Sequence, residues 1–230
     1  MTIYRSALIS RREGLSEARF RDHWIRIHGE LASHLPGVGT YRQNHIAERF
    51  HEAGDVPVQA IDGISQLAFG SIAAMEVSDA SPEYARVKAD IPLFQGGITI
   101  LVLQAERLFG SERLERGQHP AKLLWLSTRR AGVPADGLQA RWLRESAAAG
   151  VAVPGARRQV QNFVVDRSHP VHAGVPAGSA DAVEALSELW FDDVEALRAG
   201  LASPAGQRLV HADPLLAPIA VYRIEEIHII

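Results

Sequence analysis

Residues 64–69, Ile-Ser-Gln-Leu-Ala-Phe, decide the fold, because they return 122 residues later as Leu-Ser-Glu-Leu-Trp-Phe at 186–191. Upstream, a second set of residues returns 118 residues later: Gly14, Trp24, Pro36, Gly37, Gln43 and Asn44 recur as Gly132, Trp142, Pro154, Gly155, Gln161 and Asn162. The change of offset places a four-residue insertion in the second copy, between the two matched stretches. Solenoid units run roughly 20 to 50 residues, so a repeat of this length indicates a duplicated domain.

Each copy predicts the same order of elements. In the first, strands are expected at 3–10, 39–47, 64–70 and 98–108, with a helix after the N-cap Ser16 and a helical segment around Ser81-Pro82. In the second, strands are expected at 121–128, 156–165, 186–192 and 219–229, with helical segments at 135–149 and 193–212. The order β-α-β-β-α-β is that of a ferredoxin-like unit.

The expected division of the chain is a first domain at 1–110, a polar linker at 111–120 and a second domain at 121–230. A single ferredoxin-like unit covers only one face of its sheet with helices. The closing strand at 219–229 is apolar on both faces, so the bare face must also be covered. The other copy is the simplest cover. The sequence therefore predicts an α+β chain that forms an internal pseudo-dimer.

Composition excludes several classes of protein and site. The net charge of −3 comes with no long run of Lys or Arg, which argues against a nucleic-acid partner. The absence of cysteine excludes disulfides and thiolate nucleophiles. No apolar run is long enough for a bilayer span and the N-terminus carries charge, so a cytoplasmic protein without a membrane partner is expected. The glycine-rich signatures of nucleotide binding and the paired-histidine spacings of metal sites are missing, so we expect neither cofactor nor metal.

Several stretches resemble one known family. Residues 20–31, Phe-Arg-Asp-His-Trp-Ile-Arg-Ile-His-Gly-Glu-Leu, resemble the helix signature of EthD-domain proteins. Residues 35–45 resemble the segment that follows that helix in the family. The segments at 62–63, 186–193, 197–206 and 225–228 resemble the later signatures of that family. In order and spacing the resemblance covers nearly the whole chain twice.

The resemblance implies a tandem EthD protein of the dimeric α/β-barrel superfamily, with two ferredoxin-like βαββαβ repeats forming one intramolecular barrel. It also implies a pocket between sheet and helices, and a link to xenobiotic breakdown or to the modification of aromatic polyketides. Barrels of this kind often pair, so a homodimer of the chain is an open alternative. A shared fold does not determine the reaction.

Differences between the copies point to the candidate site. His28 corresponds to Ser146, Tyr41 to Gln159 and His45 to Phe163, while Asp62 corresponds to Glu184. The first copy has thus kept the polar positions of the family, and the second has lost three of the four. The predicted catalytic residues are therefore His28, His45, Tyr41 and Asp62, and the predicted substrate contacts are Trp24, Phe20, Phe69 and Gln66.

The residue types fit proton transfer. Histidine exchanges protons near neutral pH, and a histidine–tyrosine pair with a carboxylate nearby could remove a proton and stabilise an enolate. Structural roles compete with this interpretation. Trp24 recurs as Trp142 and is expected in the core, Asp62 could cap a turn, and His28 could bond a loop carbonyl. His228 is expected to be only an edge residue.

These residues favour a cofactor-free enzyme, a lyase or isomerase, that dehydrates, decarboxylates or isomerises a small aromatic, polyketide-like or xenobiotic-derived molecule. Two alternatives remain open. One is a non-catalytic protein that binds a small ligand in the same barrel fold. The other is a haem-linked or cofactor-independent monooxygenase, since relatives of this fold perform such chemistry.

Overall fold

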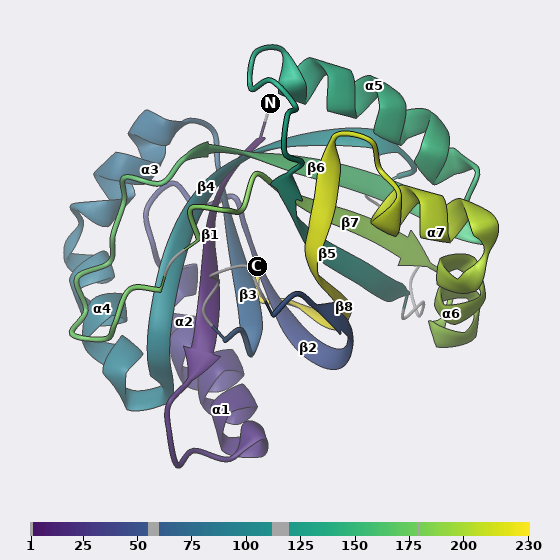
Figure 1. Ribbon diagram of the computed structural model, residues 1–230. Coiled ribbons are helices and arrows are strands. Elements are labelled where there is room, and N and C mark those ends of the chain that lie inside the picture. Colours follow the sequence, from purple (N-terminus) through teal and green to yellow (C-terminus); the bar gives the residue numbers. More distant parts are fainter. Residues whose placement is uncertain (1, 55–59, 112–119, 179) are drawn as a thin grey trace.

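A computed structural model describes residues 2–54, 60–111, 120–178 and 180–230 of the chain. Its strands form one closed antiparallel barrel in the order β1-β3-β2-β8-β5-β7-β6-β4 (Figure 1). The strands of the first half are β1 Thr2–Arg11, β2 Thr40–Glu52, β3 Gly63–Phe69 and β4 Gln95–Phe109. Those of the second half are β5 Ala121–Arg129, β6 Ala156–Asp166, β7 Ala185–Phe191 and β8 Leu216–His228.

The two halves join at both edges of their sheets. Strand β2 pairs with β8, and β4 pairs with β6, each antiparallel. In the described part of the chain, closing the barrel gives every strand two neighbours. The predicted intramolecular α/β barrel of two ferredoxin-like repeats is confirmed. The boundaries proposed between the two domains stay a prediction, and most of the predicted linker, 112–119, lies outside the described residues.

The helices lie outside the barrel, those of each half against their own strands (Figure 1). In the first half they are α1 Glu17–His23, the π-helical turn η1 Trp24–His28, α2 Gly29–Ser33, α3 Ile72–Asp79 and α4 Pro82–Phe94. In the second half they are α5 Leu138–Val151, α6 Val194–Ala202 and α7 Pro204–His211. In the described part of the chain, no helix is long and apolar enough to cross a bilayer.

The helical segment expected around Ser81-Pro82 is two helices, not one. The Ser81 hydroxyl accepts a hydrogen bond from the Tyr84 amide, which caps α4, and Pro82 takes the first helical position, where its missing N–H is no loss. Ser203-Pro204 repeats the device in the second half, where Ser203 caps α7. The local chemistry therefore explains why the break recurs in both copies.

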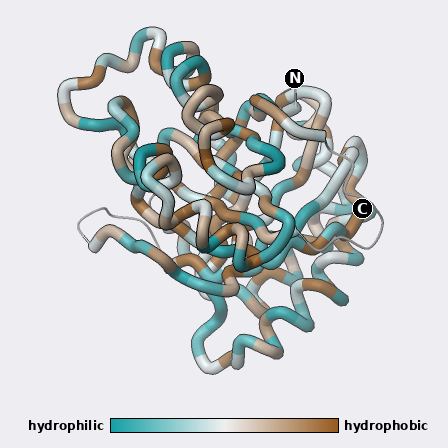
Figure 2. Tube along the Cα trace, turned by 90° about the vertical axis from the view of Figure 1, so that its right-hand side faces the viewer, coloured by the Kyte–Doolittle hydropathy of each residue, from teal (hydrophilic) through white to brown (hydrophobic). Residues whose placement is uncertain are grey.

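The alternation of side chains along each strand builds two kinds of core, and Figure 2 shows hydrophobic and hydrophilic residues alternating along the chain. Side chains that point into the barrel form one cluster, including Leu8, Ile64 and Leu124. Side chains on the outer face, such as Ile9 and Tyr41, pack beneath the helices of the first half. Each half thus has a layer between its sheet and its helices, which is where the resemblance places a pocket.

Candidate functional site

The first helix of the chain changes pitch where it crosses the sheet. Residues Trp24–His28 form a π-helical turn, in which the Gly29 amide donates to the Trp24 carbonyl. The Gln43 side-chain amide donates to the same carbonyl at 2.8 Å, so β2 fixes the turn from below. Trp24 and His28 are both buried against the sheet as a result. Short π-helical turns occur frequently at functional sites.

His28 is held by a carboxylate of the opposite helix. Its Nδ1 lies 2.9 Å from Asp90 Oδ2, and His23 Nε2 lies 2.8 Å from Asp90 Oδ1. His28 is 7% exposed and Asp90 is 6% exposed. A carboxylate can only accept, so Asp90 selects the His28 tautomer that carries its proton on Nδ1. Nε2 of His28 is then the ring nitrogen available to a ligand.

Burial determines the charge of this pair. Burial lowers the pKa of His28, and the opposing contacts with Asp90 do not restore it. Burial raises the pKa of Asp90, but the hydrogen bonds from His28 and His23 outweigh that effect and leave it below its usual value. At neutral pH, His28 is therefore a neutral imidazole beside an ionised carboxylate, which is the state that a general base requires.

Tyr41 is oriented as a hydrogen-bond donor. Its hydroxyl oxygen accepts from Trp24 Nε1 at 3.1 Å and from Gln43 Nε2 at 3.0 Å. These two bonds occupy both lone pairs of the oxygen, so the hydroxyl proton is left to donate to a ligand. Burial raises the pKa of Tyr41, which keeps that proton in place.

His45 continues the chain of bonds along β2. Its Nε2 lies 3.1 Å from Gln43 Oε1, and its ring centroid lies 4.4 Å from that of Trp24. Its Nδ1 is buried and has no hydrogen-bond partner among the described residues. Burial, aided by the positive charge of Arg21, lowers the pKa of His45 to about 3. A ring with this pKa is neutral at physiological pH and exchanges protons poorly, but it can accept a hydrogen bond at Nδ1.

The close packing of Trp24 depends on a glycine. A Cβ at Gly63 would lie 2.3 Å from the Trp24 ring, so only glycine lets the indole rest on β3. The corresponding residue of the second copy is Ala185, which packs near Trp142. The two tryptophans recur as core residues, but only that of the first half donates to a tyrosine.

His28 and Tyr41 line one small cavity between helices and sheet, with a volume of about 20 Å³. Arg5, Tyr84 and Gln95 line it as well. Arg5 donates to the Tyr84 hydroxyl and pairs with Asp79. The side-chain amide of Gln95 is buried and finds no hydrogen-bond partner among the described residues. Unsatisfied buried amides are rare, and this one faces the cavity, where a ligand could bond it.

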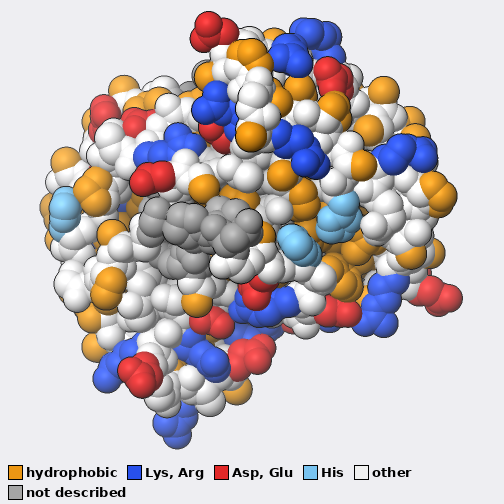
Figure 3. Space-filling model, in the orientation of Figure 1, with side chains coloured by type: hydrophobic (Ala, Val, Ile, Leu, Met, Phe, Trp, Pro, Cys, Tyr) orange, Lys and Arg blue, Asp and Glu red, His pale blue; other side chains and the backbone are white. Residues whose placement is uncertain are grey.

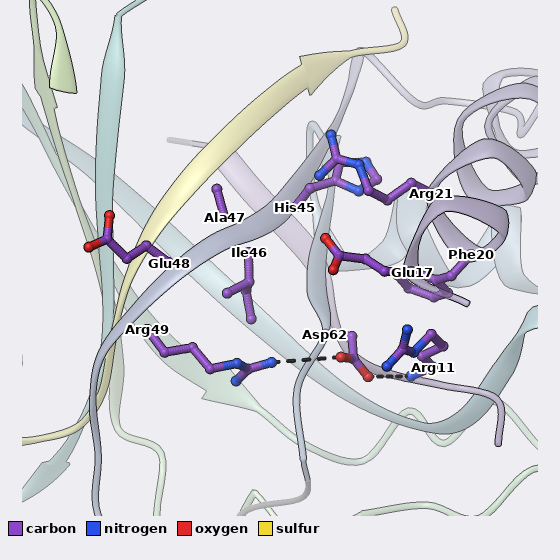
Figure 4. A pocket seen from close by; sticks show the side chains of 10 residues that line it. All are labelled: Arg11, Glu17, Phe20, Arg21, His45, Ile46, Ala47, Glu48, Arg49 and Asp62. Atoms are coloured by element: carbon purple, nitrogen blue, oxygen red, sulfur yellow. Dashed lines mark hydrogen bonds and ion pairs between the residues drawn. The ribbon is translucent and has the colours of Figure 1, made fainter. Parts of the chain in front are cut away.

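His45, Asp62 and Phe20 line a separate pocket of about 390 Å³ at the surface (Figure 4). There Asp62 accepts from the Arg11 amide at 2.7 Å and lies 3.7 Å from the Arg49 guanidinium. The predicted site is thus divided in two. Gln43 connects the parts, because it bonds both Tyr41 and His45.

Two predicted substrate contacts lie elsewhere. Gln66 points into the barrel, where it bonds Asn44 and Glu188. Phe69 lines a third pocket of about 420 Å³, shared with Arg42 and His228. The structure does not bring either residue to His28. The predicted roles of all eight residues stay predictions.

Sequence reasoning missed two buried charges. Asp90 lies on the buried stripe of α4, beside Val87 and Ile91, and a carboxylate at such a position signals a buried partner. Lys122 stands in an apolar run and is fully buried in the barrel. Its Nζ lies 2.5 Å from Glu188 Oε2 and also contacts Glu226 and Asn44. This second network joins the two halves, since Lys122 and Asn44 lie on different copies.

The matching layer of the second half has a different character. The Ser146 hydroxyl and the Gln159 amide are buried without a hydrogen-bond partner among the described residues. A Cβ at Gly150 would collide with the Gln159 side chain, so Gln159 fills the space beside α5. No titratable pair like His28 and Asp90 occupies these positions. In the described ranges, no group of three or more His, Asp or Glu side chains could hold a metal ion.

Comparisons with known proteins agree with this architecture. The EthD domain family matches residues 12–96. Three solved structures are similar to nearly the whole chain. They are a candidate monooxygenase from Lactobacillus acidophilus NCFM (11% identity, TM-score 0.57, covering 100% of this chain and 94% of that one), an anthrone oxidase-like protein (12%, 0.57, 99% and 93%) and a candidate chlorite dismutase (16%, 0.52, 97% and 95%). Among curated proteins no sequence matches. At these identities the structural likeness establishes the fold alone.

Proposed function

We propose that the chain is an enzyme with one active site, in the first half of its two-copy α/β barrel, where the EthD family model matches residues 12–96. The site lies between the helices and the sheet, at His28 and Tyr41. Its substrate is a small aromatic or polyketide-like ketone or phenol, and the reaction moves a proton without a cofactor. The observation that carries this proposal is the buried His28–Asp90 pair beside a cavity that Tyr41 also lines.

The proposed step begins at His28. Its Nε2 takes a proton from a carbon that the substrate carbonyl acidifies, either next to the carbonyl, as in 1-tetralone, or conjugated with it through aromatic rings, as in anthrone. The electron pair of that C–H bond forms an enolate. Asp90 stabilises the imidazolium through Nδ1, and Tyr41 donates its hydroxyl proton to the enolate oxygen in a hydrogen bond. Return of the proton to another carbon is an isomerisation. Loss of a hydroxyl group as water, protonated by His28, is a dehydration.

The surroundings suit a flat, apolar substrate. Ile9, Leu67 and Ile91 give the cavity apolar walls. Phe94 packs against the His28 ring, with ring centroids 4.8 Å apart. Arg5 and the free amide of Gln95 offer polar partners for substrate oxygens. His45 is assigned a positioning role, because it lines the separate surface pocket and its bond to Gln43 orients the amide that holds Tyr41.

Proton exchange on a panel of aromatic ketones, such as 1-tetralone and anthrone, tests the proposal without a known substrate. Deuterium uptake from the solvent is followed by NMR. We expect wild-type protein to accelerate exchange and His28→Asn to lower the rate by roughly 10²–10⁴-fold, as for a lost general base. Tyr41→Phe should cost about 10²-fold, as for one lost oxyanion donor. Ser146→Ala, at the position matching His28 in the second copy, is the control and should retain the wild-type rate.

Three other outcomes of the exchange assay would each contradict the proposal. Equal exchange by wild type and His28→Asn would remove His28 from the mechanism. Saturable binding of the ketones with no exchange above the buffer rate would leave a ligand-binding protein of the same fold. Oxygen consumption, with or without added haem, would instead favour an oxygenase.

A further inference from the structure

We propose that residues 167–178 of the second half, here called the covering segment, are the lid of the first-half site, and that Val171 limits the size of the molecule that enters. The second half would then contribute to the reaction without a catalytic group of its own. The identity of the site as catalytic rests on the function proposed above, whereas the movement of the segment can be tested separately.

The covering segment belongs to an unusually long connection. Residues 167–184 join β6 to β7, an 18-residue link, and the matching link between β2 and β3 has 10 residues, 53–62. The four-residue insertion found in the sequence falls in the same region. No helix or strand forms in its described part, 167–178 and 180–184. Connections longer than roughly 12–15 residues without secondary structure are uncommon in compact domains and are usually either functional loops or disordered linkers. This one packs on the first half, which favours a functional loop.

The covering segment lies on the other half of the molecule. Figure 1 shows it in green, passing from the end of β6 across the side of α3, α4 and β4. Val171 is only 6% exposed and joins the hydrophobic cluster of the first half, and Ala173 and Val175 pack on the same cluster. The Ile98 amide donates to the Pro176 carbonyl at 3.1 Å, and the Thr99 hydroxyl donates to the Gly178 carbonyl at 2.9 Å.

The N-terminal end of the covering segment is held by its own half. At one end, Asp166 accepts from Ser168 and lies 2.9 Å from His169 Nε2, while Arg167 donates to the Val183 carbonyl. Two hydrogen bonds tie this segment to β4, one from the Ile98 amide to Pro176 and one from the Thr99 hydroxyl to Gly178. Small residues such as Ala173 and Gly174 form the middle. Breaking these bonds and the apolar contacts of Val171, Ala173 and Val175 would therefore lift the segment from the first half about its anchored N-terminal end.

The closed site needs such an opening. A cavity of about 20 Å³ holds about one water molecule, far less than an aromatic ketone. A second pocket of about 120 Å³ lies directly beneath the covering segment, lined by Val171, and shares Ile98 with that cavity. Lifting the covering segment would open the cavity at His28 and Tyr41 from the side of Ile98. A lid that closes over a substrate also excludes water from an enolate.

Amide exchange of the ligand-free protein tests the movement directly. If the covering segment lifts, the Ile98 amide, bonded to Pro176, should exchange at least tenfold faster than the Leu103 amide in the centre of the same strand. Equal protection at Ile98 and Leu103 would overturn the proposal. This readout needs neither a substrate nor a reaction, so it separates failure of the lid from failure of the proposed function.

A reversible lock tests whether the movement controls entry. The chain has no cysteine, so Thr99→Cys combined with Gly178→Cys places one disulfide across the hydrogen bond between these residues. We expect the oxidised form to bind and exchange anthrone at least tenfold more slowly, with recovery after reduction, while Thr99→Cys alone is insensitive to oxidant. Val171→Gly should speed the exchange of anthrone relative to 1-tetralone, and Val171→Phe should slow it. Equal rates for the oxidised and reduced lock would contradict the assignment as a lid.

Discussion

Phe163 stands at the position of the second copy that matches His45. Replacing His45 by phenylalanine should make the protein less sensitive to acid. The folded-state pKa of His45 is about 3, below the usual value near 6.5, because the ring is buried. The unfolded chain therefore binds a proton that the folded chain refuses. The free energy of unfolding is therefore at its full value above about pH 6.5 and falls as the pH drops from there toward 3.

The size of the effect follows from the shift. One such group changes the free energy of unfolding by about 1.4 kcal/mol per pH unit between the two pKa values. From about pH 6.5 to about pH 4.5 this is at most roughly 2–3 kcal/mol, since His45 borders a solvent-filled pocket that screens its charge. In a chain of this length it corresponds to about 4–12 °C in melting temperature.

Calorimetric melting of wild type and His45→Phe at both pH values measures this difference. The variant also deletes a hydrogen bond to Gln43, so its absolute stability at neutral pH falls. The difference in slope is therefore the relevant quantity. His34→Gln, at a side chain that is 64% exposed, serves as the control and should follow the wild-type slope. Parallel acid profiles for wild type and His45→Phe would refute the reasoning.

Other predictions concern packing, buried charge and the second copy. Gly63→Ala should lower stability by about 1–3 kcal/mol because its Cβ meets the Trp24 ring, while Gly70→Ala, with open space around it, should melt near wild type. Lys122→Met should cost about 3–5 kcal/mol in urea unfolding, because Glu188 stays buried without its cation, and adding Glu188→Gln should recover part of that loss. Phe163→Leu in the second copy should leave ketone exchange within about twofold of wild type. Unchanged stability in Gly63→Ala or Lys122→Met, or a large loss of exchange in Phe163→Leu, would contradict the corresponding structural argument.

The element order was predictable because hydrophobic periodicity and the repeat agree with each other. The strand expected at 64–70 is β3 at Gly63–Phe69, and the helix expected at 135–149 is α5 at Leu138–Val151. The strand expected at 39–47 extends to Glu52 as β2. The extension, residues 48–52, is mostly polar and pairs with β8, which is far away in the sequence. A local pattern of side chains could therefore not reveal it.

The sequence brought together only part of the candidate site, and the roles predicted for its residues stay predictions. Comparing the copies selected His28 and Tyr41, which do line one cavity. It could not find Asp90, whose importance depends on a helix packed opposite His28, nor the π-helical turn that directs both Trp24 and His28 to the sheet. The covering segment is also a tertiary feature, because the sequence shows an insertion but not the half on which it rests.

Charged side chains of both signs are mixed over the face seen in Figure 3, so surface charge does not single out one site.

The central claim is that the first-half cavity at His28 and Tyr41 is the active site and that the second half has none. Its most direct measurement is a crystal structure of the His28→Asn protein with anthrone. The account predicts the ketone between helices and sheet of the first half, with its oxygen within hydrogen-bond distance of the Tyr41 hydroxyl and its reactive carbon facing position 28. Anthrone in the second-half layer, beside Ser146 and Gln159, would contradict it.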